Sequence, residues 1–176
     1  MTLEERIERI ESYQAIQQLP IRYAMAVDGR DVDAWVALFT PDVQVGRDAF
    51  GRDALRAHIT PMLRTFRRSI HLICGQRIDD IDGDTASGAT YCRAEHEVDD
   101  RWIVMGICYF DEYRRVDGTW FFSRRKEEHW YAADVDAHPQ RVGFDDWHAD
   151  GPGPRLPERF PTWNAFWQAS TLTLDA

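Results

Sequence analysis

Apolar residues at helical spacing mark the first part of the chain. Between residues 3 and 19 they recur every three or four positions, as in an amphipathic helix; they are Leu3, Ile7, Ile10, Tyr13, Ile16 and Leu19. Pro20 is expected to interrupt this helix, and a second helical stretch over 21–27 ends near Asp28. Three shorter elements are predicted to follow: helices over 33–39 and 52–66 and, between them, a strand over 43–46.

From residue 69 onward the pattern changes to that of long strands. Turn signals built from Asp and Gly, at 82–84 and 117–118, separate runs that are typical of hairpin strands. The predicted strands cover residues 69–81, 85–98, 101–116 and 119–131. Helices followed by an antiparallel meander predict an α+β domain, in which a curved sheet wraps over the helices and leaves a cavity at its concave face.

The composition changes again beyond about residue 134. Asp, His, Pro and Gly dominate as far as Pro157, and four aromatic residues then recur at helical spacing: Phe160, Trp163, Phe166 and Trp167. We therefore expect a domain over 1–133 and an arm over 134–176. The aromatic helix of the arm suits the core, a subunit interface or a lid over a pocket.

Charge and composition exclude several classes of partner. The formal net charge is -9, and the one basic cluster, 124–126, is followed at once by Glu127 and Glu128, so nucleic-acid binding is not expected. No apolar run is long enough to span a membrane, and the charged N-terminus does not resemble a secretory signal. The three cysteines are widely spaced, which is typical of a reducing compartment. These features predict a soluble cytoplasmic protein.

Asp28 and His71 are the first candidates for chemistry. Asp28 lies at a helix end before Gly29, where Asp is also a common turn former. His71 lies on a predicted strand, with Ile73 on the same face and Ile70 on the other. A lone strand histidine is more often a satisfied or exposed side chain than a catalyst. If the fold brings the two residues together, however, they form a general base able to take a proton from carbon.

Other titratable residues are ambiguous on their own. His96 lies between two glutamates, as on a solvated face. Arg124 and Arg125 occupy opposite faces of the last strand, so only one of them can point into a concavity; alternation groups Arg125 with Phe121 and Ser123. No P-loop, nucleophile elbow or zinc-type histidine spacing is present in the sequence.

Several segments together resemble one superfamily. They are Tyr23-x4-Asp28, Trp35-x2-Leu-Phe-Thr-Pro-Asp42, Ile70-His71, the segment 81–88 and the segment 109–120. Their order and spacing resemble the SnoaL-like branch of the NTF2-like superfamily, and within it the scytalone dehydratase, bile-acid 7α-dehydratase and hexachlorocyclohexane dehydrochlorinase families. The resemblance implies a cone-shaped α+β barrel with a curved, mostly antiparallel sheet around N-terminal helices. It also implies a homo-oligomer, a trimer or a dimer.

The same resemblance assigns roles to particular residues. It implies that Asp28 and His71 form the catalytic dyad of these lyases. Three further residues would serve the leaving group or a developing oxyanion: Tyr23, His96 and Arg125. The aromatic residues Trp35, Tyr91 and Tyr109 would bind the substrate. No metal or organic cofactor is implied.

The chain also departs from the scytalone dehydratase pattern. Val27 stands where that family has a tyrosine, and a later pocket tyrosine is missing near Arg47. Ile107 and Tyr109 stand where that family has a serine and an asparagine. Scytalone is therefore not the expected substrate.

These observations predict a cofactor-independent lyase of the dehydratase type, acting on a small hydrophobic cyclic hydroxy-ketone such as a steroid or polyketide. Two alternatives keep the same fold. One is a ketosteroid-type isomerase or polyketide cyclase, and the other is a non-catalytic ligand-binding module.

Overall fold

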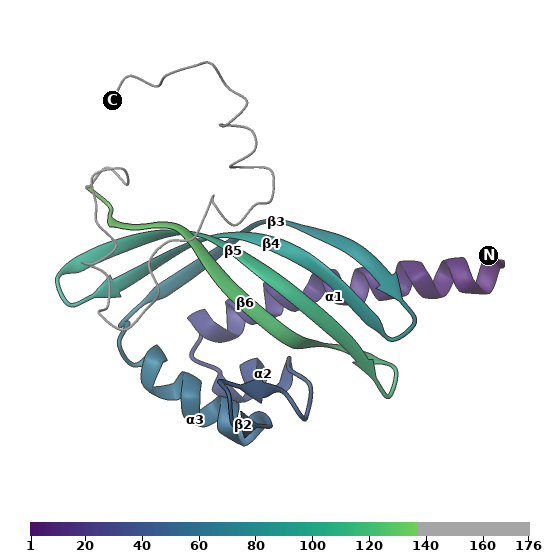
Figure 1. Cartoon of the computed structure of the whole chain (residues 1–176). Coiled ribbons are helices and arrows are strands. Elements are labelled where there is room, and N and C mark those ends of the chain that lie inside the picture. The colour runs from purple at the N-terminus through teal and green to yellow at the C-terminus, as the bar shows by residue number, and fades with distance from the viewer. Residues whose placement is uncertain (137–176) are drawn as a thin grey trace, which may run out of the picture.

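A computed structural model describes residues 1–136, in which three helices precede a four-stranded sheet (Figure 1). The helices are α1 (Leu3–Asp28), α2 (Val32–Ala37) and α3 (Arg52–Leu63). The sheet strands are β3 (Ser69–Asp82), β4 (Thr85–Val98), β5 (Arg101–Val116) and β6 (Thr119–Asp134). A small ribbon of β1 (Gln44–Val45) and β2 (Ala49–Phe50) lies between α2 and α3 in the chain. The predicted α+β architecture is confirmed.

The sheet is an antiparallel meander in chain order, β3-β4-β5-β6. It is curved and does not close on itself, and its concave side lies over the helices (Figure 1). Asp117 and Gly118 form the β5–β6 turn with φ values of 48° and 77°, which matches the left-handed conformation that two-residue hairpin loops require. The dipeptide therefore sets the pairing of the two strands next to the turn, from Val116 and Thr119 as far as Tyr113 and Phe122.

Helix α1 differs from the prediction because it continues through Pro20. Proline lacks the backbone N–H that a helix interior needs, so an interruption was expected here. In the structure Pro20 is among the fully buried side chains, and Ile16, Leu19 and Tyr23 on the same helix are buried as well. Tertiary packing therefore offsets the local cost and holds Asp28 at the end of one long helix.

The remaining boundaries differ by smaller amounts. Helix α3 ends at Leu63 and not at residue 66, and the last strand reaches Asp134, three residues beyond the predicted end. Strand β2 was not predicted. The aromatic residues of the C-terminal arm, 160–167, lie outside the described residues.

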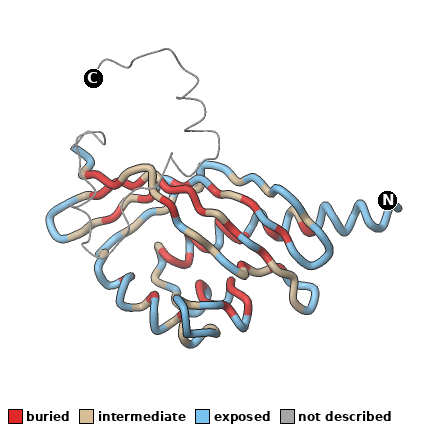
Figure 2. Tube along the Cα trace, viewed as in Figure 1, coloured by how far each residue is buried: buried red, intermediate tan, exposed pale blue. Residues whose placement is uncertain are grey.

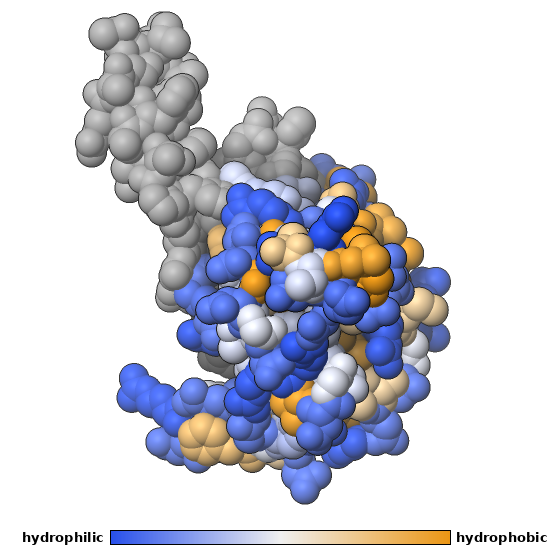
Figure 3. Space-filling model, turned by 90° about the vertical axis from the view of Figure 1, so that its right-hand side faces the viewer, coloured by the Kyte–Doolittle hydropathy of each residue, from blue (hydrophilic) through white to orange (hydrophobic). Residues whose placement is uncertain are grey.

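Buried residues form two clusters, one between the helices and the sheet and one on the sheet itself. In Figure 2 the buried residues lie along the strands of the sheet and on the parts of the helices next to it. On the face in Figure 3 hydrophilic side chains predominate, and hydrophobic ones gather in small separate patches. Within the described residues, no helix is long and apolar enough to cross a membrane.

Candidate active site

The structure brings Asp28 and His71 into direct contact, through the end of α1 and the start of β3. The ring Nδ1 of His71 lies 2.7 Å from Asp28 Oδ1, and the His71 backbone N–H donates to Asp28 Oδ2 at 2.8 Å. Because an ionised carboxylate only accepts hydrogen bonds, Nδ1 carries the proton in this pair. Nε2, with no hydrogen-bond partner among residues 1–136, is then left to accept a proton.

The Asp28 carboxylate is stabilised in its ionised form. Burial raises the pKa of this carboxyl, but the hydrogen bonds from the His71 ring, the His71 backbone and Ser69 outweigh that effect, so its pKa lies below the usual range. The His71 side chain is only 7% exposed. A negative charge is thus held against a buried imidazole, where it would stabilise the imidazolium that forms after proton transfer.

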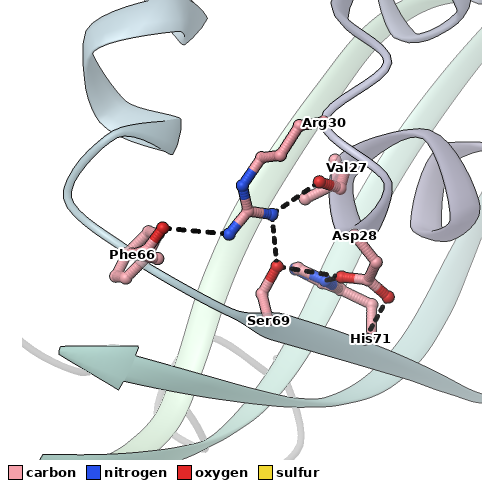
Figure 4. Close-up of polar contacts among 6 residues, drawn as sticks. All are labelled: Val27, Asp28, Arg30, Phe66, Ser69 and His71. Carbon is pink, nitrogen blue, oxygen red and sulfur yellow. Dashed lines mark hydrogen bonds and ion pairs between the residues drawn. The ribbon is translucent and has the colours of Figure 1, made fainter.

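Arg30 and Ser69 support Asp28: Ser69 reaches the same carboxylate oxygen as the His71 ring, and Arg30 holds Ser69 (Figure 4). Ser69 Oγ donates to Asp28 Oδ1 at 3.0 Å, and Arg30 Nη1 donates to Ser69 Oγ at 2.7 Å. The Arg30 guanidinium also donates to the carbonyls of Val27, at 2.7 Å, and of Phe66, at 3.0 Å. One side chain therefore ties the end of α1, the α3–β3 connection and the start of β3 around the dyad.

His71 lines a cavity of about 330 Å³ on the concave side of the sheet. This volume is within the range of small-molecule sites. Most of its wall is apolar, from Val27, Ile59, Met62, Leu63, Phe66, Met105 and Ile107. Its polar lining comes from Tyr23, Thr65, His71, His96, Tyr109, Glu127 and His129. The base thus opens on a pocket suited to a compact hydrophobic compound.

Tyr23 and His96, two of the predicted site residues, line this cavity with His71. The His96 ring lies 5.3 Å from the His71 ring, perpendicular to it, and is 4% exposed. Burial and the nearby His71 lower the pKa of His96 to about 4, so His96 is neutral at pH 7. Its buried Nδ1 has no hydrogen-bond partner in the part of the chain that the structure describes. Burial also raises the pKa of Tyr23, which remains a neutral hydroxyl.

Arg125 lies behind the cavity wall rather than in it. Its Nε and Nη2 donate to the two oxygens of Asp111, at 2.9 and 3.0 Å, and this ion pair is almost fully buried. The guanidinium lies 4.3 Å from the ring centroid of Tyr23 and 4.0 Å from that of Tyr109. Arg125 and Trp35 line a neighbouring cavity of about 700 Å³, which shares Tyr23, Ile59, Met62, Tyr109 and Glu127 with the first.

The grouping of Arg125 with Phe121 and Ser123 was wrong. The pairing register of β5 and β6 shifts between Glu112 and Tyr113, which leaves Ser123 as an extra residue in β6. A bulge of this kind changes the face on which the following side chains lie. Arg125 therefore packs on the ring of Phe122, 4.5 Å away, on the inner face of the sheet.

Tyr91 does not join the other predicted substrate-binding residues. It is 45% exposed, lines neither of these two cavities and packs near Trp130, with 6.4 Å between the ring centroids. Alternation along β4 explains this, because its neighbours Thr90 and Cys92 are the buried ones. Tyr109, in contrast, lies on the wall between the two cavities.

Sequence reasoning missed Ser69, Arg30, Glu127 and His129. His129 Nε2 lies 2.7 Å from Glu127 Oε1, and both residues line the cavity of His71. The sequence did contain a signal for this pair. Side chains alternate along a strand, so Glu127 and His129 are expected on the same face as Arg125. No sequence pattern indicated that Arg30 would reach Ser69, 39 residues away.

A family model matches most of the chain. The SnoaL-like domain matches residues 8–126. The chain belongs to the SnoaL-like domain family. An uncharacterised protein of Mycobacterium tuberculosis is 31% identical over 120 residues, which cover 64% of this chain and 81% of that protein.

Solved structures share the fold of this SnoaL-like chain. A candidate scytalone dehydratase from Novosphingobium aromaticivorans is 24% identical to this chain, with a TM-score of 0.65. The aligned part covers 76% of this chain and 94% of the chain of that protein. A hexachlorocyclohexane dehydrochlorinase of Novosphingobium barchaimii is 21% identical to this chain, with a TM-score of 0.66. The aligned part covers 76% of this chain and 96% of the dehydrochlorinase chain. At these identities the likeness shows the NTF2-like fold alone.

Proposed function

We propose that this SnoaL-like protein is a cofactor-independent lyase that removes water from a hydrophobic cyclic hydroxy-ketone. The observation that carries the proposal is the 2.7 Å contact between His71 Nδ1 and Asp28 at the edge of an apolar cavity. A base that removes a proton from carbon needs a pKa near the working pH, and imidazole is the side chain that meets this requirement. A carboxylate on its other nitrogen orients the ring and stabilises the imidazolium.

The elimination follows from this arrangement in two parts. His71 Nε2 takes the proton from the carbon next to the ketone, and the electron pair of the C–H bond moves toward the carbonyl oxygen. The electrons then return to form the carbon–carbon double bond while the C–O bond of the hydroxyl group breaks. The departing hydroxide needs a proton, for which the neutral hydroxyl of Tyr23 and the neutral ring of His96 are the candidate donors in the cavity.

Arg125 has a supporting role in this proposal. Because it is bound to Asp111 and stacked against Tyr23 and Tyr109, it holds these two rings in the wall between the cavities. A cation next to the Tyr23 ring also favours donation by the hydroxyl group.

The test is product analysis with a panel of cyclic β-hydroxy-ketones, together with hexachlorocyclohexane as a halide-releasing probe. We expect release of water from a hydroxy-ketone and a loss of at least about 100-fold in kcat for His71→Gln. Glu11→Gln, at an exposed glutamate of α1 outside both cavities, should retain activity. Turnover that His71→Gln leaves unchanged contradicts the mechanism.

The mass of the product separates the proposed reaction from its main alternative. An isomerase or cyclase would use the same dyad but return the proton to the substrate, so the product mass would be conserved. A ligand-binding module would take up the compounds without converting any of them.

A further inference from the structure

Glu127 places a second carboxylate on the wall of the His71 cavity, on the other edge strand of the sheet. His71 is on β3 and Glu127 on β6, and these strands are the two edges of the same curved sheet. Glu127 is paired across the strands with Tyr109 on the inner face. Its side chain is 40% exposed and lines both cavities, so its accessible surface faces the space that a ligand would occupy.

The surroundings keep this carboxylate ionised. Burial raises the pKa of Glu127, but the hydrogen bond and charge of His129, together with the charges of His71 and Arg125, lower it below the usual range. Oε1 is held by His129 Nε2 at 2.7 Å. Oε2 has no hydrogen-bond partner within residues 1–136. This oxygen is therefore open to a donor from the ligand, because the side chain is partly exposed and lines the cavity.

We propose that Glu127 binds the polar end of the ligand by accepting a hydrogen bond from a hydroxyl or ammonium group. This inference rests on the proposed function for the other end of the ligand, where the reacting carbon lies against His71. It specifies the substrate class further: an apolar ring compound with a hydrogen-bond donor on the side remote from the reacting carbon. Compounds with a carboxylate at that position are rejected, because two negative charges would face each other across a mostly apolar cavity.

The nearby cations do not cancel this preference. Arg125 is bound through two nitrogens to Asp111, and its guanidinium is stacked against aromatic rings. His129 is engaged through Nε2 with Glu127 itself. In the cavity of His71 a donor on the ligand therefore meets the Glu127 carboxylate. The other cations, Arg124, Lys126 and the Arg125 Nη1 that has no hydrogen-bond partner within residues 1–136, line the neighbouring cavity.

The test is a binding assay with four naphthalene probes that differ in one substituent: 2-naphthol, 2-naphthylmethylammonium, 2-methoxynaphthalene and 2-naphthoate. Affinities are measured by calorimetry for the wild-type chain and for Glu127→Gln. Glu127→Asp keeps the charge in case Glu127→Gln fails to fold, and circular dichroism monitors folding. Glu95→Gln is the matched control, because Glu95 lies on β4 outside both cavities and pairs with Arg93.

For the wild-type chain we expect the ammonium and naphthol probes to bind about tenfold more tightly than the methoxy probe, and naphthoate to bind most weakly. In Glu127→Gln the ammonium probe should lose about tenfold in affinity, the methoxy probe should be unchanged and naphthoate should gain. Glu127→Asp and Glu95→Gln should both keep the wild-type order. The proposal is overturned if Glu127→Gln has the same ranking of probe affinities as the wild-type chain. It is also overturned if the wild-type chain binds none of the probes.

The assay separates this inference from the proposed function. Selective binding without any elimination would leave the role of Glu127 intact and contradict the lyase. Elimination that depends on His71, without selective binding of probes that carry a donor group, would support the lyase and contradict the role of Glu127.

Discussion

At the scale of single residues, Ser69 and Arg30 are positioning residues for the dyad. Ser69→Ala removes a donor to Asp28 and should raise the pKa of that carboxyl back toward its ordinary value. Arg30→Gln should act in the same direction, because it releases the Ser69 hydroxyl. Both variants should lower kcat, since they disturb the base. Ser69→Ala should leave KM nearly unchanged because Ser69 does not line the cavity, whereas Arg30 also binds the carbonyl of Phe66 in the cavity wall.

The measurement is the pH titration of Asp28 by carbon NMR, combined with steady-state kinetics. Ser87→Ala, on an exposed site of β4, is the control and should change neither quantity. If the Asp28 pKa in Ser69→Ala equals that of the wild type, Ser69 does not position the dyad.

Asp111 should carry a large share of the stability of the domain. It accepts hydrogen bonds from Thr90, Tyr113 and Arg125 and is buried, so its removal leaves the Arg125 charge uncompensated. Asp111→Ala should lower the free energy of unfolding by about 3 to 5 kcal/mol, as measured by urea denaturation. Glu112→Ala on the same strand removes only an exposed pair with Arg124, and it should cost less than about 1 kcal/mol. Equal losses in the two variants would contradict this account.

At the scale of secondary-structure elements, two glycines of the sheet should respond differently to substitution. A Cβ at Gly88 would lie 2.3 Å from the backbone oxygen of Arg77, beside the irregularity between Ile78 and Asp80. Gly88→Ala must therefore displace backbone, and it should cost about 1 to 3 kcal/mol. Gly75→Ala places its Cβ in open space, and it should change the free energy of unfolding by less than about 0.5 kcal/mol.

Urea denaturation of the two variants tests this prediction, with near-UV circular dichroism to detect any rearrangement of the sheet. Comparable stabilities of Gly88→Ala and the wild type would show that β3 does not approach β4 as closely as described.

Sequence patterns determined the elements where local chemistry and tertiary structure agree. The bounds of β4 and β5 were predicted without error, because a turn with strong local preferences adjoins each of them. Predictions from sequence patterns failed where packing overrides a local rule, as at Pro20. They also failed where a bulge changes the face of a strand, as at Ser123. Alternation alone cannot locate an inserted residue, so the true neighbours of Arg125 could not be derived from the sequence.

At the scale of the whole molecule, His96 should make stability depend on pH. Its pKa falls from an ordinary 6.5 to about 4 in the folded chain, so between these values the unfolded chain binds more protons. Stability is therefore complete above about pH 6.5 and is lost as the pH falls toward 4, by up to about 3 kcal/mol. His96→Gln should flatten this dependence.

Urea denaturation at a series of pH values between 4 and 8 provides the measurement. Asp28, whose pKa is also lowered, adds a separate loss of stability at lower pH. If the free energies of unfolding of His96→Gln and the wild type change in parallel between pH 6.5 and pH 4, His96 does not cause the pH dependence.

The candidate site could be predicted only in part because its groups come from distant segments. The resemblance identified Asp28 and His71, which lie 43 positions apart, because both fall in recognisable stretches. Glu127 and Arg30 belong to no such stretch, and only the curvature of the sheet brings β6 opposite β3. Tyr91 lies on the face of β4 turned away from the cavity, because its neighbours Thr90 and Cys92 are the buried ones.

The most direct test of the central claim, that Asp28 and His71 form a base that takes a proton from carbon, is hydrogen–deuterium exchange at a carbon acid. A cyclic ketone that lacks a leaving group, such as 2-tetralone, is incubated with the protein in deuterated buffer and followed by NMR. The wild-type chain should accelerate exchange next to the carbonyl, and His71→Gln should reduce this acceleration by about 100-fold or more. If the wild-type chain gives no acceleration, or if His71→Gln retains it in full, His71 is not such a base.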